Sequence, residues 1–320
     1  MNLYLKRRVG ALFIILIATM VLGASFGSVK IPFAELLLKE NRMILNLRLL
    51  RIFVAVVAGS GLAVSGIVLQ AILRNSLAEP YLLGTSSGAG LGAIIAIILG
   101  LSSAYLPLSA FIGAILSIIL VYNLARQNNK IPEQSLILSG VIVSVALSAI
   151  IVFLVSISGD EALHGLTWWL WGNLQVYDPK LLMLVTSVVF LGVAVIYIFS
   201  QDLNAISIGD EEATHLGINV EAVKKILILI TSLITASLVC ICGIIGFVGL
   251  MIPHMMRLVV GPNHKILIPT TALAAAIFMV VCDILSRMIF PPLEIPVGVI
   301  TAVLGAPTFI ILLKRSQAIK

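Results

Sequence analysis

Residues 52–73 read IFVAVVAGSGLAVSGIVLQAIL and contain no charged side chain. An α-helix rises about 1.5 Å per residue, so roughly 20 apolar residues cross the hydrocarbon layer of a membrane. This run is long enough, and within it residues 59–66 place Gly, Ala and Ser on successive turns. Small residues let helix backbones approach closely in lipid. We therefore predict a membrane-spanning helix that packs tightly against its neighbours.

Comparable runs recur along the whole chain. They stand at 9–29, 84–106, 107–125, 134–159, 181–201, 226–247 and 295–313, and a further run, 266–286, contains only Asp283 as a charge. Of the 320 residues 60% are hydrophobic and 11% are charged. That composition excludes a soluble domain. We predict an all-α integral membrane protein with one transmembrane domain over residues 1–320.

Charge at the chain ends sets the number of spans. Lys6, Arg7 and Arg8 near the start and Lys314 and Arg315 near the end indicate that both termini are cytoplasmic, which requires an even number of spans. The tenth span is either 162–177 or 248–262. Choosing 248–262 leaves more Lys and Arg on the inside, so we favour it. The basic start of the first run resembles a secretory signal, but nine further spans favour a retained helix.

One group of basic residues runs against this orientation rule. Five of them fall in the first external loop, where positive charge opposes the predicted topology. Arg48 and Arg51, three positions apart at the start of a helix, project from one face, and Arg287 reaches the same side of the membrane. We therefore expect these residues to serve a purpose other than setting the orientation, and anchoring to lipid phosphates is one such purpose.

Residues 209–217, GDEEATHLG, form an acidic segment that this topology places in the cytoplasm. Asp210 is expected to cap the start of a short helix, and Glu211 and Glu212 lie in its first turn, where the helix dipole favours acids. Gly217 permits a left-handed exit. A helix this short is unstable alone in water. We therefore expect flanking structure and a protein partner to hold it.

The motifs of catalysis are missing from the sequence. It has no G-x-x-x-x-G-K-[ST] loop for ATP, no H-E-x-x-H or Cys/His cluster for a metal, and no G-x-S-x-G elbow. No basic stripe with aromatics suggests nucleic acid. We predict neither an enzyme nor a cofactor or metal site, and take Cys240, Cys242 and Cys282 as buried apolar residues.

Charged side chains within the apolar runs are sparse. Asp283 is the one acid within the apolar runs, and Arg287 follows one turn later on the same helix face. The pair is either a structural ion pair near the external end of its span or a relay in an ion-coupled secondary transporter. We favour the ion pair and keep the secondary transporter as the alternative function.

Several segments together resemble one known family. They are LRLLRIF (47–53), QAILRNSLAEPYLLGTSSGAGLG (70–92), WWLWGNL (168–174), DLNAISIGDEEATHLGINV (202–220), GIIGFVGLMIPHMMRLVVGPNHK (243–265) and LEIPVGVITAVLGAPTFIILL (293–313). In this order they resemble the FecCD-type permeases of ABC importers for iron–siderophore complexes, haem and cobalamin. The resemblance covers essentially the whole chain.

The resemblance implies ten transmembrane helices, a short external interfacial helix at WWLWGNL, and a homodimer in the cell membrane. Its partners would be two copies of a cytoplasmic ABC ATPase and an extracytoplasmic substrate-binding protein. The ATPase-coupling helix would consist of Gly209, Asp210, Glu211, Glu212, Ala213, Thr214, His215, Leu216 and Gly217. Binding-protein docking would use Arg48, Arg51 and Arg287, and the cytoplasmic gate would use Asn75, Leu77, Glu133 and Gln134. The cargo would be a ferric siderophore, haem or cobalamin.

Overall fold

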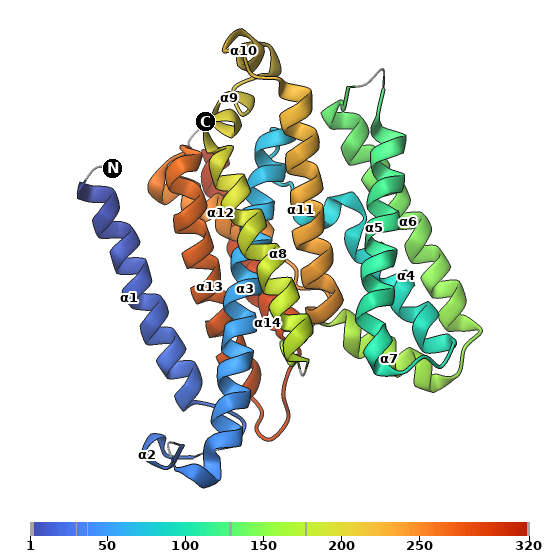
Figure 1. Cartoon of the computed structure of the whole chain (residues 1–320), viewed down its shortest axis with the longest axis vertical. Coiled ribbons are helices and arrows are strands. Elements are labelled where there is room, and N and C mark those ends of the chain that lie inside the picture. The colour runs from blue at the N-terminus through green and yellow to red at the C-terminus, as the bar shows by residue number, and fades with distance from the viewer. Residues whose placement is uncertain (1–2, 30, 37, 128–129, 177, 319–320) are drawn as a thin grey trace.

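The computed structural model of the chain describes residues 3–29, 31–36, 38–127, 130–176 and 178–318. The described chain is almost entirely helical (Figure 1). Its long helices are α1 (Leu3–Ser25), α3 (Arg42–Ile72), α5 (Leu106–Ala125), α6 (Glu133–Ser156), α8 (Pro179–Ile198), α11 (Val220–Cys242), α13 (His264–Met288) and α14 (Val297–Ala318). The shorter ones are α2 (Phe33–Leu36), α4 (Thr85–Ile98), α7 (Asp160–Leu170), α9 (Ser200–Ile206), α10 (Asp210–His215) and α12 (Val248–Val260).

Each of the ten predicted spans corresponds to one helix. Seven are long and apolar enough to cross a membrane, namely α1, α3, α5, α6, α8, α11 and α13. The other three, α4, α12 and α14, contain shorter apolar stretches among the described residues. The all-α membrane fold is therefore confirmed, and the count of ten spans stays a prediction.

The choice between the two candidates for the tenth span agrees with the packing. Helix α12 lies within the bundle in contact with α3 and α13. Helix α7, which carries most of the other candidate, lies at one end of the bundle below α4, α5 and α6 (Figure 1). Trp168 and Trp171 near its end are exposed, with their ring centroids 5.6 Å apart. A short helix is therefore present beside the predicted segment WWLWGNL, but it ends at Leu170, so only the first three residues of that segment are helical.

Helix α3 is the centre of the bundle. It is the most buried of the long helices, followed by α11 and α13, whereas α1, α5, α6 and α8 turn most of their apolar side chains outward. Its glycines explain the close packing. A Cβ at Gly66 would lie 1.9 Å from the Gly249 carbonyl oxygen of α12, and one at Gly59 would lie 2.5 Å from the Ala275 carbonyl oxygen of α13. The predicted role of these small residues is confirmed.

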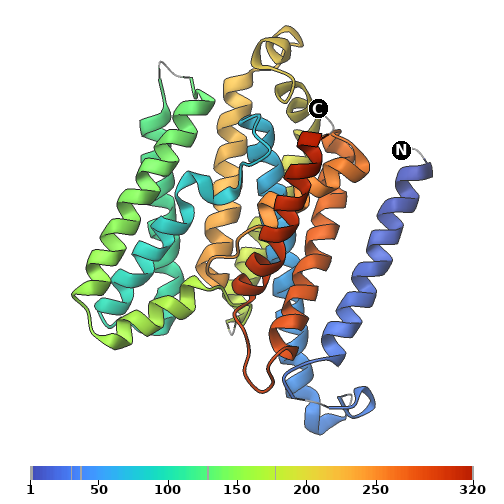
Figure 2. The same cartoon turned by 180° about the vertical axis from the view of Figure 1, so that it is seen from behind.

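The two ends of the bundle differ. Both termini, α9 and α10 lie at one end, and α2, α7 and the loop between α13 and α14 lie at the other (Figures 1 and 2). The first-loop arginines are not in a loop, because α3 begins at Arg42, ten residues before the uncharged run. The charged candidate residues therefore form two groups, one at each end.

Candidate functional site

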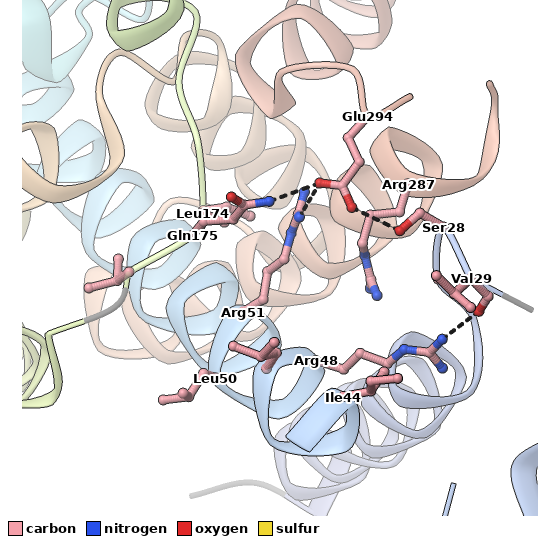
Figure 3. A pocket seen from close by; sticks show the side chains of 13 residues that line it. Ser28, Val29, Ile44, Arg48, Leu50, Arg51, Leu174, Gln175, Arg287 and Glu294 are labelled. Carbon is pink, nitrogen blue, oxygen red and sulfur yellow. Dashed lines mark hydrogen bonds and ion pairs between the residues drawn. The ribbon is translucent and has the colours of Figure 1, made fainter. Parts of the chain in front are cut away.

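A cavity of about 260 Å³ lies at the end of the bundle opposite α10. Arg48 and Arg51 of α3, Arg287 of α13, and Gln175 and Glu294 from two connecting segments contribute to its lining (Figure 3). The structure thus brings together the three arginines that the sequence assigned to docking, although 236 positions separate Arg51 from Arg287. It adds an acid, Glu294, to which the sequence analysis gave no role.

Two of the arginines share one buried carboxylate. Asp283 on α13 has no solvent-exposed surface. Its Oδ1 lies 2.5 Å from Nε of Arg51, and its Oδ2 lies 2.7 Å from Nη2 of Arg287. A charge this deep requires oppositely charged partners, because desolvation of an unpaired ion is very costly. The predicted structural ion pair between Asp283 and Arg287 is confirmed, with Arg51 as a third member.

Glu294 extends the ion-pair network from Arg51 to Gln175 and Ser28. Its Oε2 accepts from Nη1 of Arg51 at 2.5 Å and from the amide of Gln175 at 3.0 Å, while its Oε1 accepts from the Ser28 hydroxyl at 3.1 Å (Figure 3). Burial raises the pKa of Glu294, but the hydrogen bond and charge of Arg51 outweigh burial and hold that pKa below its ordinary value. Glu294 therefore remains ionised at neutral pH.

Arg48 is bound differently. Its guanidinium donates to three carbonyl oxygens at the end of α1 and just beyond it, those of Ala24 (2.9 Å), Ser25 (3.0 Å) and Val29 (2.7 Å). Carbonyl groups do not neutralise its charge. Arg48, Arg51 and Arg287 set against Asp283 and Glu294 therefore leave the group with one net positive charge.

The structure buries the three arginines that the sequence assigned to docking. Arg48, Arg51 and Arg287 are 6%, 8% and 3% exposed. Each is held by partners within the chain, so they reach the exterior through the cavity they line. Their role in docking stays a prediction. The basic side chains that do stand exposed on α3 and just before it are Arg42 and Lys39.

At the opposite end, α10 projects from the bundle as a single short helix (Figure 1). Glu211, Glu212 and Leu216 are exposed, and Ala213 is fully buried. Gly217 has φ +83°, so the predicted left-handed exit is confirmed. The flanking structure that the sequence required is present, because α10 contacts both α9 and α11.

The predicted cap of α10 is wrong. Gly209 occupies the N-cap position, and no side chain caps the helix. Asp210 is the first helical residue, and its Oδ2 lies 2.5 Å from Nζ of Lys224 on α11. The ion pair takes the carboxylate that the sequence had assigned to capping, because Lys224 is almost fully buried and needs a partner.

The predicted gate residues also lie at this end. Asn75 and Leu77 follow α3, and Glu133 and Gln134 begin α6. An ion pair between Arg74 and Glu133 joins the two segments, with Nε of Arg74 2.8 Å from Oε1 of Glu133. This hydrogen bond raises the pKa of Arg74. Their role in gating stays a prediction.

Sequence reasoning missed Glu294, Lys224 and Arg74. Each makes a contact with a residue at least 14 positions away, and no local spacing rule predicts such pairs. One signal was available for Lys224, since it lies inside an apolar helix with a second lysine, Lys225, beside it. Among the described residues no three His, Cys, Asp or Glu side chains gather as a metal site would require.

The comparisons with known proteins decide the family. A sequence model described as the FecCD transport family matches residues 14–315. The chain belongs to this family. Among its curated relatives, the cobalamin import system permease protein BtuC of Halobacterium salinarum is 40% identical over 278 residues, which cover 85% of this chain and 73% of the relative. The Fe(3+) dicitrate transport system permease protein FecD of Escherichia coli is 34% identical over 305 residues, 93% of this chain and 95% of the relative.

A solved structure shows the same fold. A chain of a metal-chelate type ABC transporter in an inward-facing conformation matches with a TM-score of 0.88 and 32% identity, over 97% of this chain and 99% of that one. This FecCD protein is therefore a multi-pass membrane permease component of an ABC importer. Its relatives are transporter permease subunits, a family of non-enzymes.

Proposed function

We propose that the chain moves a bulky metal chelate or tetrapyrrole (a ferric siderophore, haem or cobalamin) into the cytoplasm, using ATP hydrolysed by a separate subunit. The observation that carries this proposal is the family match over nearly the whole chain, to relatives named for cobalamin and ferric dicitrate. The sequence contains no phosphate-binding loop of its own, so import driven by ATP would need a separate ATPase.

The cavity with Arg48, Arg51 and Arg287 is the docking site for the binding protein. Its net charge of one unit favours an acidic side chain from the partner, and complementary charge chiefly raises the association rate and fixes the register. A homodimer would present two such cavities, related by a two-fold axis, to a two-lobed binding protein.

Helix α10 is the element that couples the permease to its ATPase. Glu211 and Glu212 offer acids to basic or amide groups of the partner. Leu216 and Ile208, each 71% exposed, flank them with apolar surface beyond the helix ends. An acidic helix bordered by exposed aliphatic side chains suits a groove on another protein better than open solvent. In this orientation α10 and both termini are cytoplasmic.

The secondary transporter is the weaker candidate. Its relay would be Asp283, which is fully buried between Arg51 and Arg287. The two oxygens of Asp283 lie 2.5 Å and 2.7 Å from arginine nitrogens, so neither oxygen is open to a transported ion. No second acid lies within the described part of α13.

Whole-cell uptake tests the proposal and the substrate class. Cells that lack the chain are compared with complemented cells for uptake of radiolabelled ferric hydroxamate siderophore, haem and cyanocobalamin, each supplied with the cognate binding protein and ATPase. We expect complementation to restore uptake of one class. Failure to restore any of the three would count against the proposed cargo.

The docking site has its own test. Arg48→Gln removes the unneutralised charge and leaves the Asp283 network intact, and Lys180→Gln, which removes an exposed positive charge outside the cavity, serves as the control. We expect Arg48→Gln to slow association of the binding protein at low ionic strength, with the difference vanishing at high salt. Equal association rates for both variants and the wild type would show that the cavity takes no part in docking.

A further inference from the structure

Four charged side chains form a continuous chain at the α10 end of the bundle. They are Asp210 on α10, Lys224 on α11, Glu133 at the start of α6, and Arg74 after α3. Their charges alternate along the chain, and each lies on a different element. The tops of α10, α11 and α6 lie at the same end of the molecule (Figure 1).

Lys224 is the centre of this chain. It is 1% exposed and is among the largest fully buried side chains of the described residues. Its Nζ lies 2.5 Å from Oδ2 of Asp210 and 3.9 Å from Oε1 of Glu133. A buried ammonium group is stable only with such partners. The other oxygen of Asp210 is buried with no hydrogen-bond partner among the described residues.

The next link reaches the segments assigned to the gate. Oε1 of Glu133, the atom nearest Lys224, also accepts from Nε of Arg74 at 2.8 Å. Arg74 has φ +43°, a left-handed backbone that is rare outside glycine, and it directly precedes Asn75. The ion pair therefore holds the backbone of Arg74 beside the start of α6.

A second contact joins α11 to the segment just before α6. Glu221, three residues before Lys224 and so on the same side of α11, accepts from the backbone N–H of Ile131 at 3.2 Å. The first two turns of α11 thus contact the chain at two points, the backbone just before α6 and the first residue of α6. Lys224 contacts α10 on one side and the start of α6 on the other, and Glu221 contacts the backbone just before α6.

We infer that Lys224 is a positioning residue that transmits the movement of α10 to the cytoplasmic gate through Glu133 and Arg74. The inference rests on the proposed roles of α10 and of the gate residues. It goes beyond them in naming the contact that joins the two. Spatial connection alone does not establish coupling, so the test measures coupling directly.

The experiment uses the complete complex with its ATPase in lipid nanodiscs. One spin label is placed at Gln134→Cys in each subunit, with Cys240, Cys242 and Cys282 replaced by alanine. Pulsed electron resonance then reports the distance between the two labels with and without ATP. In the parent complex we expect ATP to shift the distance distribution.

Lys224→Met should leave ATPase assembly and ATP hydrolysis at parent levels while weakening the ATP-dependent shift. The expected loss is about 5- to 150-fold in the ratio of the two populations, the usual range for coupling between sites. Lys224→Arg should restore the shift because it keeps the charge. Lys225→Met, which changes the adjacent exposed lysine, is the matched control and should change nothing.

Glu133→Gln removes the ion pair between Glu133 and Lys224, while Lys224 keeps its ion pair with Asp210. This variant replaces Lys224→Met if Lys224→Met does not fold. The double variant should be no worse than either single one, because both interrupt the same chain. A normal ATP-dependent shift in both single variants would overturn the inference and leave the proposed function standing. A parent complex that binds its ATPase but shows no shift would overturn the gate assignment and the inference with it. No ATPase binding by the parent would instead contradict the proposed function.

Discussion

Replacing Asp283 by asparagine removes the one carboxylate that Arg51 and Arg287 share. The change preserves shape but converts a group of net charge +1 into one of net charge +2. Arg51 keeps its 2.5 Å contact with Glu294. Arg287, 3% exposed, keeps only carbonyl acceptors, those of Phe26 at 2.8 Å, Gly23 at 3.1 Å and residue 283 itself at 3.3 Å.

Breaking a buried ion pair by removing one partner costs about 3–5 kcal/mol. Because one of the two arginines retains a carboxylate and asparagine still accepts a hydrogen bond, we expect the lower end, about 3 kcal/mol. The free energy of unfolding is measured by tryptophan fluorescence during denaturation of the purified permease in mixed micelles. Glu40→Gln, which changes an exposed acid just before α3, is the control and should lie within about 0.5 kcal/mol of wild type.

A wild-type stability for Asp283→Asn would refute this account of the ion-pair network around Asp283. It would mean that the carboxylate does not stabilise the arginines. If the variant also lost transport driven by an ion gradient, the relay of a secondary transporter would become the better explanation of Asp283.

Three further predictions follow from other parts of the structure. Glu211→Lys combined with Glu212→Lys should leave the permease inserted and dimeric but abolish ATPase co-purification and ATP-driven uptake; wild-type values for both would show that α10 is not the coupling element. Gly66→Ala should destabilise the chain by about 1–3 kcal/mol through overpacking against the Gly249 carbonyl, and an unchanged unfolding midpoint would show that the backbones separate freely. The pKa of Glu294 is lowered in the folded state, so its ionised form stabilises the fold. The stability difference between wild type and Glu294→Gln should therefore be constant above about pH 5 and shrink as the pH falls below about 4. A difference that does not vary with pH would contradict the ion pair.

The sequence predicted the membrane helices because their signal is local. Each apolar run is long, and α5 and α6 begin within one residue of the predicted position, α6 at the charged residue Glu133 and α5 just before Pro107. The prediction for 84–106 was too long at its far end. Helix α4 ends at Ile98, and the chain turns at Gly100 with φ +65° before Pro107 enters the next helix.

The interactions within the two charged groups could not be predicted in the same way. The sequence placed Arg48, Arg51 and Arg287 on one side of the membrane. It also paired Asp283 with Arg287, because residues four positions apart on a helix are neighbours. It could not pair Arg51 with Asp283, since 232 positions separate them. The capping prediction for Asp210 failed for the same reason, because the competing partner, Lys224, approaches from another helix.

The most direct test of the proposed ATP-driven import is uptake into proteoliposomes that contain the permease, with binding protein and the transported chelate outside. Internal ATP, the cognate ATPase and an imposed proton or sodium gradient are supplied separately and together. The account predicts uptake only when ATP and the ATPase are both present, with no requirement for a gradient. Uptake driven by a gradient in vesicles without the ATPase would contradict it.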